Sequence, residues 1–153
     1  DWLTIGGNYA YTDATYDSYP GSESCPVGAV QAADGTCDLA GFTLPFAPEN
    51  KGSVYADVFL PDAVGDWGVK LHGDVNYSSE AFSNDTFLST EVIDSRTLVN
   101  ASVSFVSPSE KYLASIVVRN LTDETYCVWC LDGGPASLNT PREILFRFSA
   151  KFD

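Results

Sequence analysis

The sequence contains no methionine and little positive charge. Its 153 residues include 8 Lys and Arg against 21 Asp and Glu, which gives a formal net charge of −13. A protein face that binds the phosphate backbone must be basic, so the charge balance speaks against a nucleic-acid partner. No apolar run reaches the roughly 18 residues that a membrane-spanning helix needs, but spanning strands need only about 9–11 alternating residues each.

Apolar and polar residues alternate along most of the chain. In segment 67–78 the odd positions are apolar or glycine, and the even positions are small or polar. This period of two predicts a β-strand with one apolar and one polar face. Further segments alternate in the same way, at 2–11, 53–60, 97–106, 112–121 and 143–152. We therefore predict an all-β fold of six antiparallel strands that pair in sequence order, with very little helix.

The connections between the predicted strands differ in length. The turns at 61–66 and 107–111 are short, and the loops at 12–52, 79–96 and 122–142 are long. Outer-membrane barrels have tight turns on the periplasmic side and longer loops outside. Six strands cannot close such a barrel, and an open edge in lipid leaves backbone groups unpaired. We interpret the chain as the C-terminal part of a larger transmembrane β-barrel.

The two faces of the predicted wall carry different residues. The alternation predicts lumen-facing positions for Lys70, His72, Asp74, Asn76, Asn100, Ser102, Arg119 and Arg147. These groups could line a path for a solute or form hydrogen bonds with a domain inside the barrel. The alternative is that they are only hydrated by water in a polar barrel interior. Predicted to face outward are Val69, Leu71, Val75, Val99, Val103, Phe146 and Phe148, with an aromatic belt of Trp67, Tyr9, Tyr11 and Tyr77 near the membrane interfaces.

The four cysteines lie in two of the long loops. Their even number and Gly-, Asp- and Pro-rich surroundings favour disulfides and an oxidising compartment. Closing a shorter loop costs less chain entropy, so we predict the pairs Cys25–Cys37 and Cys127–Cys130. The Cys127-Val-Trp-Cys130 spacing leaves a redox or metal site as an alternative.

The residues suggest no catalytic, cofactor or metal site. His72 and Asp74 share a face, but two ligands are too few to bind a metal, and no Gly-x-Ser-x-Gly elbow is present. The first 50 residues hold seven acidic groups and no Lys or Arg: Asp1, Asp13, Asp17, Glu23, Asp34, Asp38 and Glu49. This loop either attracts cationic ligands or is a solvated loop whose carboxylates bind divalent ions that bridge to lipopolysaccharide.

Several stretches resemble the barrel of TonB-dependent outer-membrane receptors. The most specific is Val118-Arg-Asn-Leu-Thr-Asp-Glu-Thr-Tyr126, which is similar to that family's penultimate strand and the turn after it. The segments 44–51, 74–80, 100–105 and 141–152 also resemble family sequences. A near-terminal aromatic residue such as Phe152 is, by this resemblance, the signal read by the barrel assembly machinery. The family usually ends on that residue, whereas Asp153 follows here.

The resemblance implies a fold and a function. In that family a barrel of about 22 strands surrounds an N-terminal plug, and an N-terminal box contacts TonB, which supplies the energy. Such receptors sit among the lipid and lipopolysaccharide of the Gram-negative outer membrane and import scarce nutrients such as ferric siderophores. Residues 1–153 would supply the last six strands of such a barrel and would contain neither the plug nor the TonB box. A transport receptor of this kind is not expected to be an enzyme. The alternative that the residues leave open is a secreted all-β carbohydrate-binding module with disulfide-stapled loops.

Overall fold

The computed structural model describes residues 2–134 and 136–152, so Asp1 and Asp153, named above, lie outside the described residues. Six long strands form one antiparallel sheet in the order β1-β4-β5-β8-β9-β12. Their bounds are β1 Leu3–Tyr11, β4 Asn50–Val64, β5 Trp67–Ser78, β8 Arg96–Val106, β9 Tyr112–Arg119 and β12 Glu143–Ala150. The predicted all-β fold and its sequential antiparallel pairing are confirmed.

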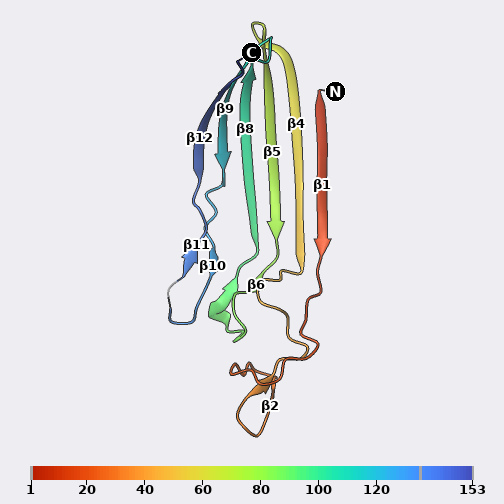
Figure 1. Ribbon diagram of the computed structural model, residues 1–153, viewed down its shortest axis with the longest axis vertical. Coiled ribbons are helices and arrows are strands. Elements are labelled where there is room, and N and C mark those ends of the chain that lie inside the picture. The colour runs from red at the N-terminus through yellow and green to blue at the C-terminus, as the bar shows by residue number, and fades with distance from the viewer. Residues whose placement is uncertain (1, 135, 153) are drawn as a thin grey trace.

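The connections lie at the two ends of the sheet according to their length. Both short turns are at one end, the turn end, and all three long loops are at the other, the loop end (Figure 1). The long loops are residues 12–49, 79–95 and 120–142, which we call the first, second and third loop. They contain the short strands β2 Val30–Gln31, β3 Cys37–Asp38, β6 Ala81–Phe82, β7 Val92–Ile93, β10 Cys127–Trp129 and β11 Ser137–Leu138, and the 3-10 turn η1 Ser89–Glu91. Residues 2–134 and 136–152 contain no helix with the length and hydropathy that a membrane-spanning helix requires.

The strand predicted at 53–60 is longer in the structure, and the turn predicted at 61–66 is correspondingly shorter. The pairing of β4 with β5 shifts between Leu60 and Val64, so a bulge interrupts the ladder there. Pro61 cannot donate a ladder hydrogen bond, and Asp62 has a φ of 51°, which suits a bulge more than a regular strand. The pairing resumes at Val64, which lies opposite Trp67, so β4 ends only two residues before β5 begins.

Each face of the sheet carries the residues that the alternation predicts. The register places one apolar residue from every strand in a single row across the sheet: Leu3, Val58, Leu71, Val103, Ile116 and Phe146. The seven residues predicted to face outward all lie on this side, which we call the apolar face. Most of them are exposed to solvent, and the exposed fraction of Phe146 is 80%. Val69 differs because it is buried, flanked in the register by the larger Leu60 and Phe105.

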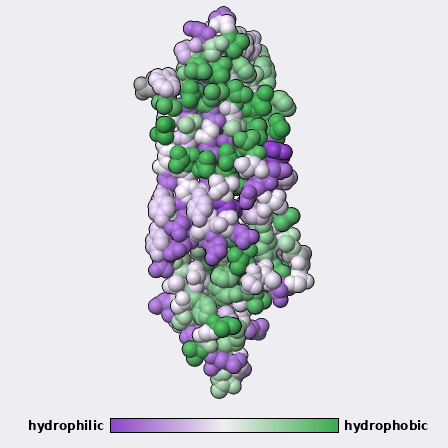
Figure 2. Space-filling view, turned by 180° about the vertical axis from the view of Figure 1, so that it is seen from behind, coloured by the Kyte–Doolittle hydropathy of each residue, from purple (hydrophilic) through white to green (hydrophobic). Residues whose placement is uncertain are grey.

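The buried residues of the protein gather mainly in the loops. Four of the six most buried apolar residues are Leu39 and Cys37 in the first loop, Ile93 in the second and Cys130 in the third. The sheet itself is a single layer, and no other part of the described chain covers its apolar face. Figure 2 shows hydrophobic residues gathered over the sheet half of one side, with more polar residues toward the loops. A single layer with an apolar face needs an apolar surrounding or a further layer to cover it.

Candidate functional site

The polar face of the sheet carries the residues predicted to face a barrel lumen. Lys70, His72, Asp74 and Asn76 alternate along β5, and Asn100 pairs with Asp74 from β8. The strand register places Arg119 in β9 and Arg147 in β12 on the same side of the sheet as Lys70. The alternation therefore places all of these candidates on one side of the sheet.

Four of the candidates form a hydrogen-bonded cluster centred on the Asp74 carboxylate. Asn100 Nδ2 donates to Asp74 Oδ2 at 2.8 Å, and Asn76 Nδ2 donates to the same oxygen. His72 Nε2 lies 3.1 Å from Asp74 Oδ1, and His72 Nδ1 lies 2.8 Å from Asp57 Oδ1 in β4. Both ring nitrogens of His72 thus face carboxylate oxygens. The cluster spans three neighbouring strands and gives this part of the polar face a net acidic character.

The cluster contains the residue types of a hydrolase triad, but not the geometry. Asp57, His72 and Ser102 are cross-strand partners in one row. In a triad the second imidazole nitrogen bonds the serine that it activates. Here that nitrogen is bonded to Asp74 instead. Within the described ranges, no group of three or more His, Cys, Asp or Glu side chains is arranged to hold a metal ion.

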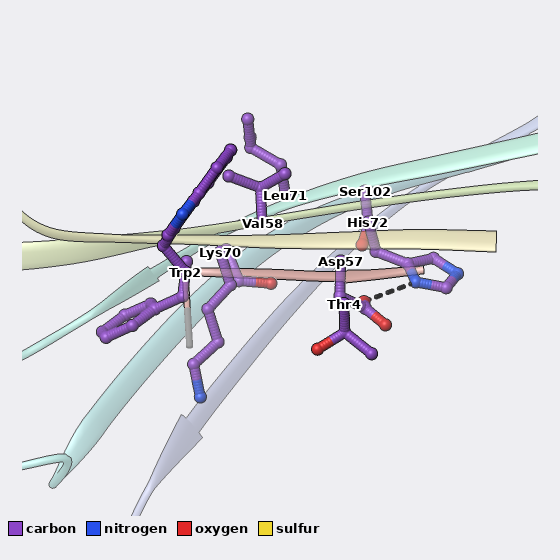
Figure 3. Close-up of a pocket in the computed structure, with 10 residues that line it drawn as sticks. Trp2, Thr4, Asp57, Val58, Lys70, Leu71, His72 and Ser102 are labelled. Carbon is purple, nitrogen blue, oxygen red and sulfur yellow. Dashed lines mark hydrogen bonds and ion pairs between the residues drawn. The ribbon is translucent and has the colours of Figure 1, made fainter. Parts of the chain in front are cut away.

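A hollow of about 380 Å³ lies beside the cluster, toward the turn end. Its polar lining includes Thr4, Asp57, Lys70 and His72. Figure 3 shows Asp57 and Lys70 on the opposite side of the sheet from Val58, a residue of the apolar face. The Lys70 ammonium lies 5.6 Å from the centre of the Phe59 ring, so Lys70 stands apart from the Asp74 cluster. The charged side chains that line the hollow are therefore the Lys70 ammonium and the Asp57 carboxylate, with the His72 imidazole beside them.

Asn120 extends the polar network into the third loop. Its backbone N–H donates to Asn100 Oδ1 at 3.0 Å. Its side chain donates to the carbonyl oxygens of Glu124 and Thr140 and accepts from the N–H of Glu124 at 2.8 Å. Asn120 is buried and has a φ of 50°, a left-handed conformation that asparagine tolerates better than most residues. One residue thus closes the base of the loop and fastens it to β8.

The sequence analysis missed several members of this site. Asp57 is a polar position of the alternating segment 53–60, but nothing in the sequence marks it as the partner of His72. Tyr55 lies on the polar face, where its ring stacks near His72 and crosses over Gly6 of β1. Arg119, by contrast, does not join the cluster, because its guanidinium lies 3.7 Å from Glu143.

Both cysteine pairs are disulfides, as predicted: Cys25–Cys37 in the first loop and Cys127–Cys130 in the third. Within the segment that the Cys25–Cys37 disulfide closes, the hydroxyl and the N–H of Thr36 donate to Asp34 Oδ1 at 2.7 and 3.0 Å. These hydrogen bonds hold the pKa of the Asp34 carboxyl below its usual value. The negative charge at the tip of this loop is therefore retained in weakly acidic solution.

The aromatic residues predicted as a belt lie near the ends of the apolar face. Tyr9 and Tyr77 share one row near the loop end, and Trp67 begins β5 at the turn end. Ten residue steps from Trp67 to Tyr77 span about 33 Å along a strand, at roughly 3.3 Å per residue. A strand tilt of about 40° reduces this to about 25 Å, the height of the apolar band on outer-membrane barrels.

An open antiparallel wall with one apolar face, one polar face and unequal ends is the architecture of a β-barrel wall. Comparison with known families supports this class. The TonB dependent receptor-like β-barrel family matches residues 1–121, most of the chain, so this protein belongs to that family. The family consists of transport receptors rather than enzymes. The six long strands form a single sheet, and among the described residues no second sheet of comparable size packs against it as in a binding-module sandwich.

A solved structure gives the same architecture. The chain resembles BauA, the ferric preacinetobactin receptor from Acinetobacter baumannii, with a TM-score of 0.58 and 22% sequence identity. The match covers 74% of this chain and 16% of that receptor, and at this identity it shows the fold alone. No curated protein matches the chain.

Proposed function

We propose that this chain is part of an outer-membrane active-transport receptor that imports a scarce nutrient with energy supplied through TonB. The observation that carries the proposal is the division of the sheet into an exposed apolar face and a polar face, in a member of the TonB-dependent receptor family. Lipid and lipopolysaccharide of a Gram-negative outer membrane would contact the apolar face, and a water-filled interior suits the polar one.

The nutrient class that we favour is a ferric siderophore. The related solved structure is a receptor for ferric preacinetobactin. The three long loops gather at one end of the sheet, where they can contact a ligand arriving from outside (Figure 1). Recognition commonly lies in loops held by a rigid scaffold. The lumen-facing role of Lys70, His72, Asp74, Asn76, Asn100 and Arg119 is part of this proposal.

Residues 1–153 would supply the last six strands of a barrel of about 22 strands. The plug and the TonB box would lie in another part of the receptor. The outer edges of β1 and β12 have no partner among the described residues, and strands of the complete barrel would cover them. Six strands enclose no lumen, so we expect import by the complete receptor and not by this chain alone.

Uptake of labelled ferric siderophores by iron-starved cells that carry the complete receptor tests the proposal. We expect uptake to require both the receptor and TonB, and to fall when residues 26–36, the tip of the first loop, are deleted. The amount of receptor in the outer membrane should stay unchanged in the deletion variant. Uptake that persists without TonB would reject the energy source. If cells with and without the receptor take up every tested siderophore equally well, ferric siderophores are not the ligand class.

A further inference from the structure

The second and third loops meet at a buried serine. Ser83 of the second loop is 3% exposed, and Cys130 of the third loop is 6% exposed. The N–H of Cys130 donates to the Ser83 hydroxyl oxygen at 3.2 Å. The same hydroxyl lies 2.6 Å from the carbonyl oxygen of Cys130 and 3.0 Å from that of Glu91, and it can donate to either. One side chain therefore bonds both backbone groups of a residue 47 positions away.

Further contacts surround this junction. The Thr90 hydroxyl donates to Asp132 Oδ1 at 2.9 Å, again from the second loop to the third. The sulfur atom of Cys130 lies 3.6 Å from the carbonyl oxygen of Val92. Beside it, Ile93 is among the most buried residues of the molecule. The junction is thus a packed contact and not a single surface hydrogen bond.

The Cys127–Cys130 disulfide closes a ring of four residues directly at the junction. A covalent ring limits the conformations open to the backbone between its ends. The N–H of Cys130 that meets Ser83 belongs to this ring, and the C=O of Cys130 is attached to the ring directly at Cα. The disulfide therefore restricts the orientation in which the third loop presents these two groups to the second.

We propose that Ser83 and the Cys127–Cys130 disulfide form a latch that holds the third loop against the second, so that the two loops move as one unit. The latch is sensitive to thiols. A dithiol that reduces it is oxidised to its own disulfide, and Cys127 and Cys130 each gain one hydrogen as the bond between them breaks. The further expectation that the joined loops capture ligand together rests on the proposed function.

Amide hydrogen exchange of the complete receptor, followed by mass spectrometry, tests the latch directly. Ser83→Ala should speed exchange in residues 84–93 and 127–132 by about fivefold or more, because it leaves buried backbone groups of Cys130 unpaired. The double variant Cys127→Ser/Cys130→Ser should do the same. The matched control is Ser109→Ala, at an exposed serine in a turn at the other end of the sheet.

Combining the Ser83 and cysteine substitutions should add little to either alone, because both open the same latch. Unchanged exchange in Ser83→Ala, or fully additive effects, would overturn the proposal. If the cysteine variants fail to assemble, dithiothreitol treatment of an assembled Cys25→Ser/Cys37→Ser receptor, which lacks the disulfide of the first loop, gives the same comparison. Exchange that behaves as expected in a receptor that imports no tested siderophore would preserve the latch and reject the proposed function.

Discussion

The side-chain oxygen of Asn100, in β8, accepts a hydrogen bond from the backbone N–H of Asn120 over 3.0 Å. Through Asn100 the same contact joins the base of the third loop to Asp74, whose carboxylate accepts from Asn100 Nδ2 at 2.8 Å. A loop and the polar face of the sheet are therefore parts of one network. Changes in this network should affect the loop before they affect the sheet.

Replacing Asn120 with alanine should loosen the third loop. The substitution removes the bonds to Glu124 and Thr140 and places a Cβ-bearing residue without polar compensation at a φ of 50°. We expect a local loss of about 2–3 kcal/mol, seen as faster amide exchange in residues 120–126. Asn120→Gly is the control that separates the two causes, because it relieves the backbone strain but still lacks the side-chain bonds. Equal, wild-type exchange in both variants would contradict the role given to Asn120.

Gly7 should tolerate alanine poorly. A Cβ at this position would lie 2.7 Å from the carbonyl oxygen of Ser53, and moving that backbone would disturb the β1–β4 ladder. We expect Gly7→Ala to lower the free energy of unfolding by about 1–3 kcal/mol in urea titrations of the folded receptor. Gly73→Ala is the matched control. Gly73 lies on the same face as Gly7, and a Cβ there would be 3.9 Å from its nearest neighbour, the carbonyl oxygen of Asn100. The steric explanation is wrong if the two variants lose the same stability.

An arginine on the apolar face should be costly. Leu71 lies between the aromatic ends of β5, four residues from Trp67 and six from Tyr77. Near the bilayer midplane an arginine costs about 2–4 kcal/mol, so Leu71→Arg should lower stability in lipid vesicles by that amount. Ser102→Arg places the same charge on the polar face of the neighbouring strand and should cost much less. A larger loss from Ser102→Arg would reverse the assignment of the two faces.

Phe152 should affect assembly more than ligand binding. Its side chain is 83% exposed beyond the end of β12, so packing within this chain does not explain an aromatic residue there. We expect Phe152→Ala to reduce the amount of assembled receptor several-fold, with unchanged uptake per assembled molecule. Lys151→Ala is the neighbouring control. Immunoblots of outer-membrane fractions measure the effect, and wild-type levels in Phe152→Ala would remove the assembly role.

Much of the wall could be predicted because its information is local. In segment 67–78 each residue's polarity states which face it occupies, and the register across β4, β5 and β8 follows from keeping those faces together. The disulfide pairs were also predictable, since both partners lie close in sequence. The end of β4 was less predictable, because Pro61 and Asp62 are turn residues by composition and form a bulge in the structure.

The sequence by itself determined the strands, their two faces and the unequal connections, because alternation with a period of two is written into each segment separately. Tertiary structure alone decided which polar residues meet. Asp57 reaches His72, and Asn120 reaches Asn100, because the register brings different strands and the base of a loop together. The contact of Ser83 with Cys130 depends on how two loops pack against each other at the loop end of the sheet. Such contacts join positions distant in sequence, and no local pattern encodes them.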